Sequence, residues 1–304
     1  MSPHCRRLGR QLSWSGHTTS AWSPFEFTPA PPPDPHPTVT KPARPPDLRL
    51  TGNTTGAVDP MSTLFLLHQE LSMNLSTSTA LVTGANRGFG RALAAELLGR
   101  GATVYAGARN PGQVDLPGAK PIPLDITDPA SVAAAAEATG DVTVLINNAG
   151  SATGSDLLEA NLDDIRLEMD THYFGTLSMA RSFAPQIAAN GGGAILNVLS
   201  GLSWVSFPEI GAYCAAKSAE WSLTNALRVQ LADQGIQVAG LHVGYMDTDM
   251  VRAVDAAKSD PADIARIAVD GIAAGAYEIL ADNAARQAQA ALSGGVSVLY
   301  PQLP

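Results

Sequence analysis

From residue 79 onward, short apolar runs alternate with longer amphipathic stretches. The short runs have the length of strands, and the longer stretches place apolar residues three and four positions apart, as in a helix with one buried face. Strands that alternate with such helices are typical of a parallel sheet covered on both faces. The predicted strands cover residues 79–82, 103–106, 121–125, 142–146, 194–199, 236–242 and 278–281.

The stretches between these strands predict helices. Two of them open with Asp-Pro, at Asp128-Pro129 and Asp260-Pro261, where Asp suits the N-cap and Pro the first helical position. The second of these helices ends near residue 274, and a terminal helix follows the last strand. The other predicted helices cover residues 91–100, 161–188 and 211–233.

The first part of the chain has a different composition. Of the 22 prolines, 12 lie in the first 60 residues, which show no helical or strand periodicity. We therefore predict a disordered, proline-rich leader over residues 1–72 and one domain over 73–304. The leader's early arginines suit a transit peptide, and its prolines suit a docking tail. The interpretation we favour is a start assigned too far upstream, with Met61 or Met73 as the true first residue.

Charge and cysteine content narrow the class of protein. Residues 73–304 contain 23 acidic and 13 basic side chains, and this excess argues against nucleic acid or an anionic membrane as a partner. Cys5 and Cys214 are the only cysteines, so we expect no disulfide framework and no metal site. The apolar runs are far shorter than the roughly 20 residues of a spanning helix. We expect a soluble, cytoplasmic protein.

Three side chains suggest acid-base chemistry. Tyr213 and Lys217 are four residues apart in a predicted helix, so both lie on one face and the ammonium can approach the phenol. A nearby cation favours the ionised phenol and lowers its pKa toward the working range. Ser200 precedes Tyr213 by 13 residues and can hold a substrate oxygen. These parts suit hydride exchange between a nicotinamide and a carbonyl or alcohol.

A glycine-rich turn follows the first predicted strand, with the sequence Thr-Gly-Ala-Asn-Arg-Gly-Phe-Gly at residues 83–90. Gly84 permits a tight turn, Gly88 lets the backbone approach a pyrophosphate, and Gly90 allows the helix to pack closely on the strand. The N–H groups at the start of the next helix can bind anionic oxygen. The turn predicts a dinucleotide site.

Taken together, these motifs resemble the short-chain dehydrogenase/reductase family in its compact single-domain form. The resemblance rests on the TGxxxGxG turn, on Asn-Asn-Ala-Gly at residues 147–150, on Ser200, and on Tyr213-x-x-x-Lys217, and it covers about residues 76–304. It implies an α/β fold with a doubly wound, parallel, seven-stranded sheet (a Rossmann fold). It also implies a homodimer or homotetramer that interconverts carbonyls and alcohols.

The charge beside the second strand indicates the cofactor. NAD sites place an acid at the end of that strand, whereas this chain has Ala-Gly-Ala followed by Arg109. Arg109 and Arg87 offer two guanidinium groups to a 2′-phosphate, so we predict NADP. Two solvated surface arginines are the alternative.

The resemblance also implies further cofactor contacts. Lys217 binds the nicotinamide ribose, Asp125 contacts the adenine unless it merely caps a turn, and Thr248 holds the carboxamide. Asn147 lines the cleft and helps to hold the central strand. The remaining predicted contacts are Asn86, Phe89, Ala149 and Gly150, together with the three glycines of the turn and Tyr213.

Two positions depart from the family pattern. His172 stands where Asn supports a water that exchanges protons with the catalytic lysine, and Val243 replaces the Pro before Gly244. An imidazole can also donate and accept protons, so an altered relay and a purely structural histidine both stay open. The departures also leave open a catalytically impaired, NADP-binding, redox-responsive interaction protein.

The predicted function is carbonyl reduction by an NADP-dependent enzyme, with Tyr213 as acid, Ser200 on the substrate oxygen and Lys217 lowering the phenol pKa. The substrate is expected to be a small to medium apolar ketone or aldehyde. We expect the apolar side chains between Ser200 and Tyr213 either to line its pocket or to pack against a neighbouring subunit. These are Leu202, Trp204, Val205, Phe207 and Pro208.

Overall fold

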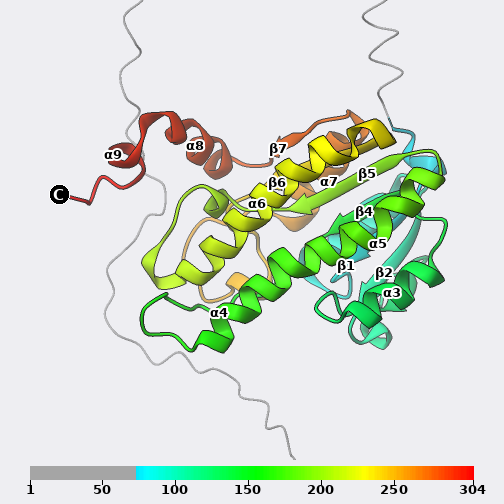
Figure 1. The fold of residues 1–304 in the computed structure, drawn as a ribbon, viewed down its shortest axis with the longest axis horizontal. Helices are drawn as coiled ribbons and strands as arrows, with labels where there is room; N and C mark the ends of the chain where they lie inside the picture. Colours follow the sequence, from blue (N-terminus) through cyan, green and yellow to red (C-terminus); the bar gives the residue numbers. More distant parts are fainter. Residues whose placement is uncertain (1–72) are drawn as a thin grey trace, which may run out of the picture.

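The structure is a computed structural model, and it describes residues 73–304. The predicted leader, residues 1–72, lies outside the described residues. Within them, seven strands form one sheet (Figure 1). The strands are β1 (Thr79–Thr83), β2 (Thr103–Ala108), β3 (Lys120–Pro123), β4 (Val144–Asn147), β5 (Gly193–Val198), β6 (Ile236–His242) and β7 (Glu278–Leu280).

The sheet is parallel throughout, in the order β3-β2-β1-β4-β5-β6-β7. Val82 of β1 is in register with Ala106 of β2 on one side and with Ile146 of β4 on the other. The strand order reverses between β1 and β4. In open α/β sheets, ligands bind at such a reversal, beyond the carboxyl ends of the strands. This topology confirms the predicted doubly wound sheet.

Helices cover both faces of the sheet. They are α2 (Gly88–Gly99), α3 (Pro129–Ala138), α4 (Leu162–Met169), α5 (Thr176–Ala189), α6 (Gly211–Leu231), α7 (Pro261–Ala273), α8 (Asn283–Ala291) and α9 (Val296–Leu299). α2 and α7 pack together against one face. α3, α5 and α6 cover the other face, which lies toward the viewer in Figure 1.

The alternation of side chains along each strand builds two separate cores. Val82 points to the layer of α2 and α7, whereas its neighbour Leu81 packs with Phe183 of α5 in the opposite layer. In β4, Ile146 and Leu145 divide between the two layers in the same way. Because both faces are covered, the central strands are apolar at most positions, and this explains the short apolar runs in the sequence.

The two Asp-Pro helix starts are confirmed. The Asp128 carboxylate accepts a hydrogen bond from Ala130 N at 3.0 Å, and Asp260 accepts one from Ala262 N at 2.7 Å. In each case the acid satisfies a backbone N–H that has no partner within the helix.

Three helix predictions differ from the structure in detail. α2 begins at Gly88 and not at residue 91, because the glycine turn leads directly into the helix. The helix predicted over 161–188 contains a π-helical turn, Asp170–Gly175, between α4 and α5. The terminal helix is divided into α8 and α9 by a break that includes Gly295, whose φ is +71°.

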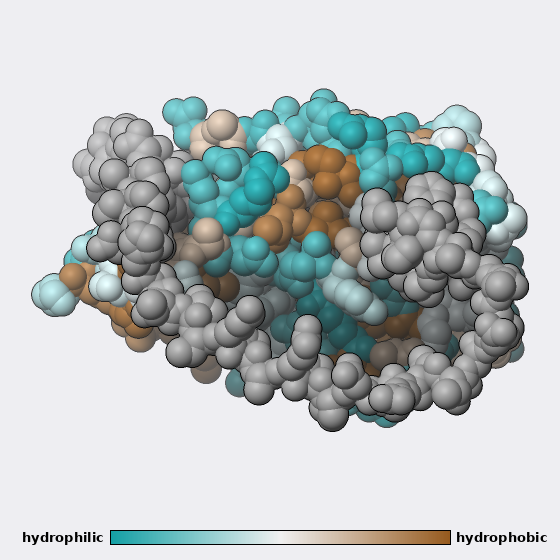
Figure 2. Space-filling model, turned by 90° about the horizontal axis from the view of Figure 1, so that it is seen from above, coloured by the Kyte–Doolittle hydropathy of each residue, from teal (hydrophilic) through white to brown (hydrophobic). Residues whose placement is uncertain are grey.

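The surface has mixed polarity. Figure 2, which views the molecule from above, shows apolar atoms gathered near the middle of this face and hydrophilic atoms around them. Among residues 73–304, no helix is both long enough and apolar enough to cross a membrane.

Candidate active site

The predicted site residues lie on loops that leave the carboxyl ends of four neighbouring strands. The glycine turn follows β1, the Asn-Asn-Ala-Gly segment follows β4, Ser200 follows β5, and Thr248 lies beyond β6. Tyr213 and Lys217 are both in the first two turns of α6. The topology therefore brings to one edge of the sheet residues that are up to 164 positions apart in the sequence.

The glycine turn has the geometry that its sequence predicts. Gly84 and Gly88 have φ values of +67° and +54°, which L side chains rarely adopt. A Cβ on Gly90 would lie 2.3 Å from the Gly84 carbonyl oxygen, so only glycine fits this approach of α2 to β1. Arg87, the N-cap of α2, makes no side-chain capping bond, and the first N–H groups of the helix therefore suit an anionic oxygen. This arrangement fits the diphosphate of a dinucleotide.

The loop after β4 is tied to the glycine turn by Thr83. The Thr83 hydroxyl accepts hydrogen bonds from the backbone N–H groups of Asn148 and Ala149, both at 2.9 Å. The Asn148 side chain donates to Thr83 O at 2.9 Å. Asn147 Nδ2 donates to Asn197 Oδ1 of β5 at 2.8 Å, so this amide holds the two central strands together. These hydrogen bonds tie the segment at residues 147–149 to β1 and β5.

Ser200 opens a short 3₁₀ turn at the end of β5. Its Oγ accepts a hydrogen bond from Leu202 N at 3.1 Å, and its backbone carbonyl accepts one from His242 Nδ1 at 3.0 Å. His242 is fully buried, and its Nε2 lies 2.6 Å from Glu278 Oε1. The position of Ser200 is thus fixed both by its own turn and by β6.

Tyr213 and Lys217 occupy one face of α6, and the Lys217 Nζ lies 5.8 Å from the centroid of the Tyr213 ring. The sequence predicted that the Tyr213 pKa is lowered, and this prediction is wrong. Burial raises the pKa of Tyr213 above its ordinary value, and the carboxylates of Glu220 and Glu168 raise it further. Lys217 and a hydrogen bond with Ser200 lower the pKa, but by less. The phenol is therefore protonated at neutral pH.

The Lys217 ammonium is buried and held on two sides. Nζ donates to Val198 O at 2.7 Å and to Glu220 Oε2 at 2.7 Å. Burial by itself lowers the pKa of Lys217, but the carboxylates of Glu220 and Glu168, together with Tyr213, raise it above its ordinary value. Lys217 is therefore a permanent cation next to Tyr213.

His172 lies in the π-helical turn, and its ring meets the Tyr213 ring edge to face with centroids 5.3 Å apart. Its Nε2 lies 2.9 Å from Ser151 O and 3.3 Å from Glu168 Oε2. A Cβ on Gly150 would lie 2.8 Å from His172 Cε1, so the glycine makes room for the imidazole. π-turns inside α-helices occur frequently at functional sites. The structure therefore brings His172 into the active site.

The other predicted cofactor residues near the glycine turn differ in their exposure and in their contacts. Arg109 is exposed just beyond β2, and Arg87 pairs with Asp249 at 3.3 Å, with 70% of its side chain exposed. A Cβ on Gly88 would lie 3.6 Å from the methyl group of Thr248, and the Asn86 amide donates to Gln113 Oε1 at 3.3 Å.

Phe89 and Asp125 have structural roles in this arrangement. The Phe89 side chain is buried in the core, which leaves its backbone for the cofactor. The Asp125 carboxylate accepts hydrogen bonds from Thr127 N at 3.0 Å and from Thr127 Oγ1 at 2.7 Å. This is the turn-capping role that the sequence left open; its adenine contact stays a prediction.

The prediction for the segment after Ser200 is wrong for two of its members. Trp204 and Val205 are buried against Ala288, Leu299 and Tyr300 at the C-terminal end of the chain. They therefore support the loop from behind and are not free to line a substrate pocket. Leu202, Phe207 and Pro208 keep some exposure and stay candidates.

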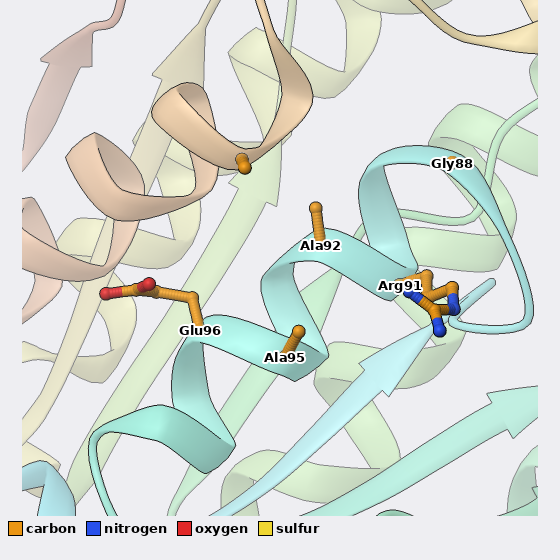
Figure 3. Close-up of a pocket in the computed structure, with 6 residues that line it drawn as sticks. Gly88, Arg91, Ala92, Ala95 and Glu96 are labelled. Atoms are coloured by element: carbon orange, nitrogen blue, oxygen red, sulfur yellow. The ribbon is translucent and has the colours of Figure 1, made fainter. Parts of the chain in front are cut away.

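A hollow lies along α2 beside the start of α7 and shares Gly88 with the glycine turn. Figure 3 shows Arg91 close to the glycine turn and Glu96 further along the helix. Its lining residues are Gly88, Arg91, Ala92, Ala95, Glu96 and Ala262. Because Ser200, Tyr213 and Lys217 do not line this hollow, we do not assign it to substrate.

Four buried residues that bear on the site were absent from the sequence prediction: Thr83, Glu168, Glu220 and His242. For two of them, the spacing in the sequence is a signal that they lie near the site. Glu220 is three residues after Lys217, and Glu168 is four before His172, so each shares a helical face with a predicted site residue. An acid at either spacing is ordinarily a solvated surface residue, and for this reason the signal is weak.

Comparison with known proteins identifies the family. The profile of the short chain dehydrogenase family matches residues 78–259. This match covers more than half of the chain, so the chain belongs to the short chain dehydrogenase family, whose members are oxidoreductases. The resemblance deduced from the sequence motifs is confirmed.

Over the aligned residues, individual relatives are about one-third identical to the chain. It is 33% identical to NADPH-dependent 1-acyldihydroxyacetone phosphate reductase of Schizosaccharomyces pombe, across 55% of this chain and 60% of that protein. It is also 33% identical to D-erythrulose reductase of Gallus gallus, across 57% and 73%. The chain thus spans about three-fifths of the S. pombe relative.

Solved structures show the same fold. A short chain dehydrogenase from Burkholderia cenocepacia, crystallised in complex with NADP, superimposes with a TM-score of 0.73 and 36% sequence identity. The match covers 76% of this chain and 99% of that one. Nearly the whole of the solved chain therefore has a counterpart here.

Proposed function

We propose that the chain is an NADP-dependent reductase of ketones or aldehydes, with Tyr213 as its proton donor. The observation that carries the proposal is the placement of Tyr213 and Lys217 on one face of α6, with Tyr213 hydrogen-bonded to Ser200 at the end of β5. A screen of apolar ketones and aldehydes at fixed NADPH, followed by nicotinamide absorbance, tests it. Silence across the panel with intact NADPH binding would instead favour the redox-responsive interaction protein.

Each side chain has a role that its position supports. Bound NADPH supplies hydride to the carbonyl carbon. Tyr213 donates a proton to the oxygen as negative charge develops, and Ser200 hydrogen-bonds the same oxygen. Lys217 stabilises the phenolate that remains, and it holds the nicotinamide ribose. The hydride and the proton together convert the carbonyl to an alcohol.

The pKa of Tyr213 favours reduction over oxidation at neutral pH. Reduction needs the protonated phenol as acid, and oxidation of an alcohol needs the phenolate as base. Because the Tyr213 pKa is raised above 10.0, the acid form dominates throughout the neutral range. Before the reaction, the Tyr213 phenol therefore carries the proton that reduction requires.

This charge state predicts different pH dependences for the two directions. The kcat/KM of reduction should be level through neutral pH and fall only when Tyr213 ionises. The kcat/KM of alcohol oxidation should rise about tenfold per pH unit across the same range. Initial rates measured in both directions with a constant-ionic-strength buffer series check this. An oxidation rate that is flat with pH would show that Tyr213 is not the titrating base.

The preference for NADP rests on charge at the end of β2. Arg109 is exposed there, no acid follows the strand, and Arg87 lies in the adjacent glycine turn. Two guanidinium groups suit the 2′-phosphate. The S. pombe relative is named for its NADPH dependence, and the Burkholderia structure contains NADP. Both are consistent with the same preference in this chain.

Replacing Arg109 with aspartate should reverse this preference. The change removes a charge-assisted hydrogen bond to the phosphate, worth about 1.5–3 kcal/mol, and supplies an acceptor for a ribose hydroxyl. We expect KM for NADPH to rise about 10- to 100-fold while KM for NADH falls. Steady-state kinetics with both cofactors measure this, with Arg181→Asp on α5 as a control. Equal use of both cofactors by the unmodified enzyme would contradict the argument.

The remaining proposals concern substrate and assembly. Leu202, Phe207 and Pro208 favour an apolar substrate of small to medium size, and the short segment between Thr248 and Asp260 leaves little room for a lid. Since the Gallus relative is named a D-erythrulose reductase, erythrulose belongs in the panel as a polar comparison. We further propose a cytoplasmic homodimer or homotetramer, which size-exclusion chromatography with light scattering would test.

A further inference from the structure

The peptide bond that follows Ser200 is held at both ends by residues at the end of β6. The Ser200 carbonyl oxygen accepts a hydrogen bond from His242 Nδ1 at 3.0 Å, and Gly201 N donates to Val243 O at 3.2 Å. This peptide fixes the ψ angle of Ser200, which is 159°. Because the backbone angles decide which side-chain rotamers are allowed, the contact with His242 helps to set the direction of the Ser200 hydroxyl.

The two acceptors around the His242 ring require a proton on each of its nitrogens. Nδ1 faces a carbonyl oxygen, which can only accept, and Nε2 lies 2.6 Å from Glu278 Oε1. Burial raises the pKa of Glu278, but His242 and Arg228 outweigh this and lower it below its ordinary value. Glu278 is therefore a carboxylate and also accepts. The ring is an imidazolium, and its hydrogen bond to Ser200 O is charge-assisted.

The imidazolium is held in place from two further sides. Glu278 Oε2 pairs with Arg228 Nη2 at 2.7 Å, and Arg228 Nε donates to Val238 O at 3.1 Å, so the carboxylate is anchored to α6 and β6. The Trp204 ring stacks on the imidazole, with centroids 3.7 Å apart and planes 12° from parallel. An aromatic face attracts a cation that lies over it. These contacts keep Nδ1 directed at Ser200 O.

Ser200, His242 and Glu278 have the composition of a hydrolase triad, but their geometry does not suit one. In such a triad the imidazole bonds the serine hydroxyl and takes its proton. Here the imidazole bonds the main-chain oxygen, while Ser200 Oγ accepts from Leu202 N at 3.1 Å and lies 3.5 Å from Val243 O. A ring that already carries both protons cannot act as a base. The arrangement therefore suits positioning of Ser200 and not its activation.

We propose that His242 is the positioning residue of Ser200 in carbonyl reduction, a role that rests on the proposed function. The imidazolium holds the peptide after Ser200, so that the hydroxyl keeps its direction toward the substrate oxygen. His242 acts through Ser200 alone and exchanges no proton during turnover. Displacing a catalytic group by about 1 Å can lower a rate about 100-fold. The effect of losing His242 should therefore appear in kcat and not in cofactor binding.

Two substitutions separate the roles of the two ring nitrogens. Asn carries its amide nitrogen on Cγ, as His carries Nδ1, so His242→Asn can still donate to Ser200 O. Gln carries it one bond further out, at the distance of Nε2, so His242→Gln keeps a donor for Glu278 and loses the one for Ser200. We expect His242→Gln to lower kcat about 10- to 100-fold with KM for NADPH within about twofold, and His242→Asn to recover most of that loss.

A double-mutant cycle with Ser200→Ala tests whether the effect passes through the hydroxyl. Ser200→Ala should itself lower kcat about 100-fold or more. In that background His242→Gln should change kcat less than about twofold, because the group that it positions is absent. Gln237→Leu is the matched control, since it removes a side-chain donor to Ala276 O at 2.7 Å at the other end of β6. It should leave kcat within about twofold of wild type.

NADPH absorbance with saturating cyclohexanone or benzaldehyde measures these rates, with enzyme in excess for the slow variants, and urea unfolding checks that each variant folds. Adding Glu278→Gln to His242→Asn removes the unpaired carboxylate and supplies a second form of this variant if the first fails to fold. Losses that multiply in the double variant, or a His242→Asn rate as low as that of His242→Gln, would overturn the positioning role. A wild-type enzyme that oxidises no NADPH with any carbonyl would instead refute the proposed function, and the positioning role with it.

Discussion

Replacing Tyr213 with phenylalanine is expected to lower kcat for carbonyl reduction by about 100- to 10,000-fold, the usual contribution of a positioned general acid. The substitution removes the hydroxyl that donates the proton and leaves the ring that packs against His172. NADPH binding should change little, since we propose that its phosphate and ribose contacts come from the glycine turn, Arg109 and Lys217. The loss should therefore appear in kcat and not in the cofactor Kd.

Two measurements separate these effects. Steady-state rates with the best carbonyl of the panel give kcat, and nicotinamide fluorescence gives the Kd for NADPH. Tyr277→Phe is a suitable control, because Tyr277 is 60% exposed just before β7 and is remote from the proposed chemistry. A Tyr213→Phe enzyme with wild-type kcat would remove the basis of the mechanism.

Replacing Lys217 with methionine should impair both activity and folding. The substitution leaves the Glu220 carboxylate buried without the cation that now lies 2.7 Å away. Removing one partner of a buried ion pair typically costs about 3–5 kcal/mol of unfolding free energy. Activity should fall as well, because the cation that stabilises the Tyr213 phenolate is gone. Urea unfolding followed by circular dichroism measures the first effect, and NADPH oxidation measures the second.

The double variant Lys217→Met/Glu220→Gln is the matched control for this experiment. It removes the uncompensated charge, so most of the lost stability should return, while the catalytic defect should persist. Recovery of both properties would show that Lys217 acts only through folding. A destabilisation below about 1 kcal/mol in the single variant would show that the ion pair is more hydrated than its burial indicates.

The fold could be predicted because its signals are local. Each strand is an apolar run bounded by turn residues, and two helices carry Asp-Pro starts whose caps the structure confirms. The glycine turn could be predicted as well. Gly84 has a positive φ, and a Cβ on Gly90 would collide with the Gly84 carbonyl oxygen, so both positions require glycine. The π-helical turn at residues 170–175 has no comparable signal. It packs against α6, a helix that lies about 40 residues further along the chain.

The features that the sequence did not indicate depend on contacts between distant segments. Trp204 was expected to line the substrate pocket or to pack against a neighbouring subunit, but it packs against the C-terminal helices of its own chain. The sequence near residue 204 contains no signal for that contact. The direction of the Tyr213 pKa shift was wrong because the spacing of Tyr213 and Lys217 shows the cation and not the burial or the two carboxylates. Nothing in the sequence singled out Glu220, which is buried because the π-helical turn packs against α6 and places His172 Nδ1 3.8 Å from its carboxylate.

The most direct test of the central claim is to follow a deuterium label from the cofactor to the product. NADPH deuterated at the transferable position would be incubated with the enzyme and the best carbonyl, and the alcohol analysed by mass spectrometry and NMR. The account predicts deuterium on the carbinol carbon in wild-type enzyme and almost no labelled alcohol with Tyr213→Phe. Alcohol that forms without the label, or equal labelling with Tyr213→Phe, would contradict it.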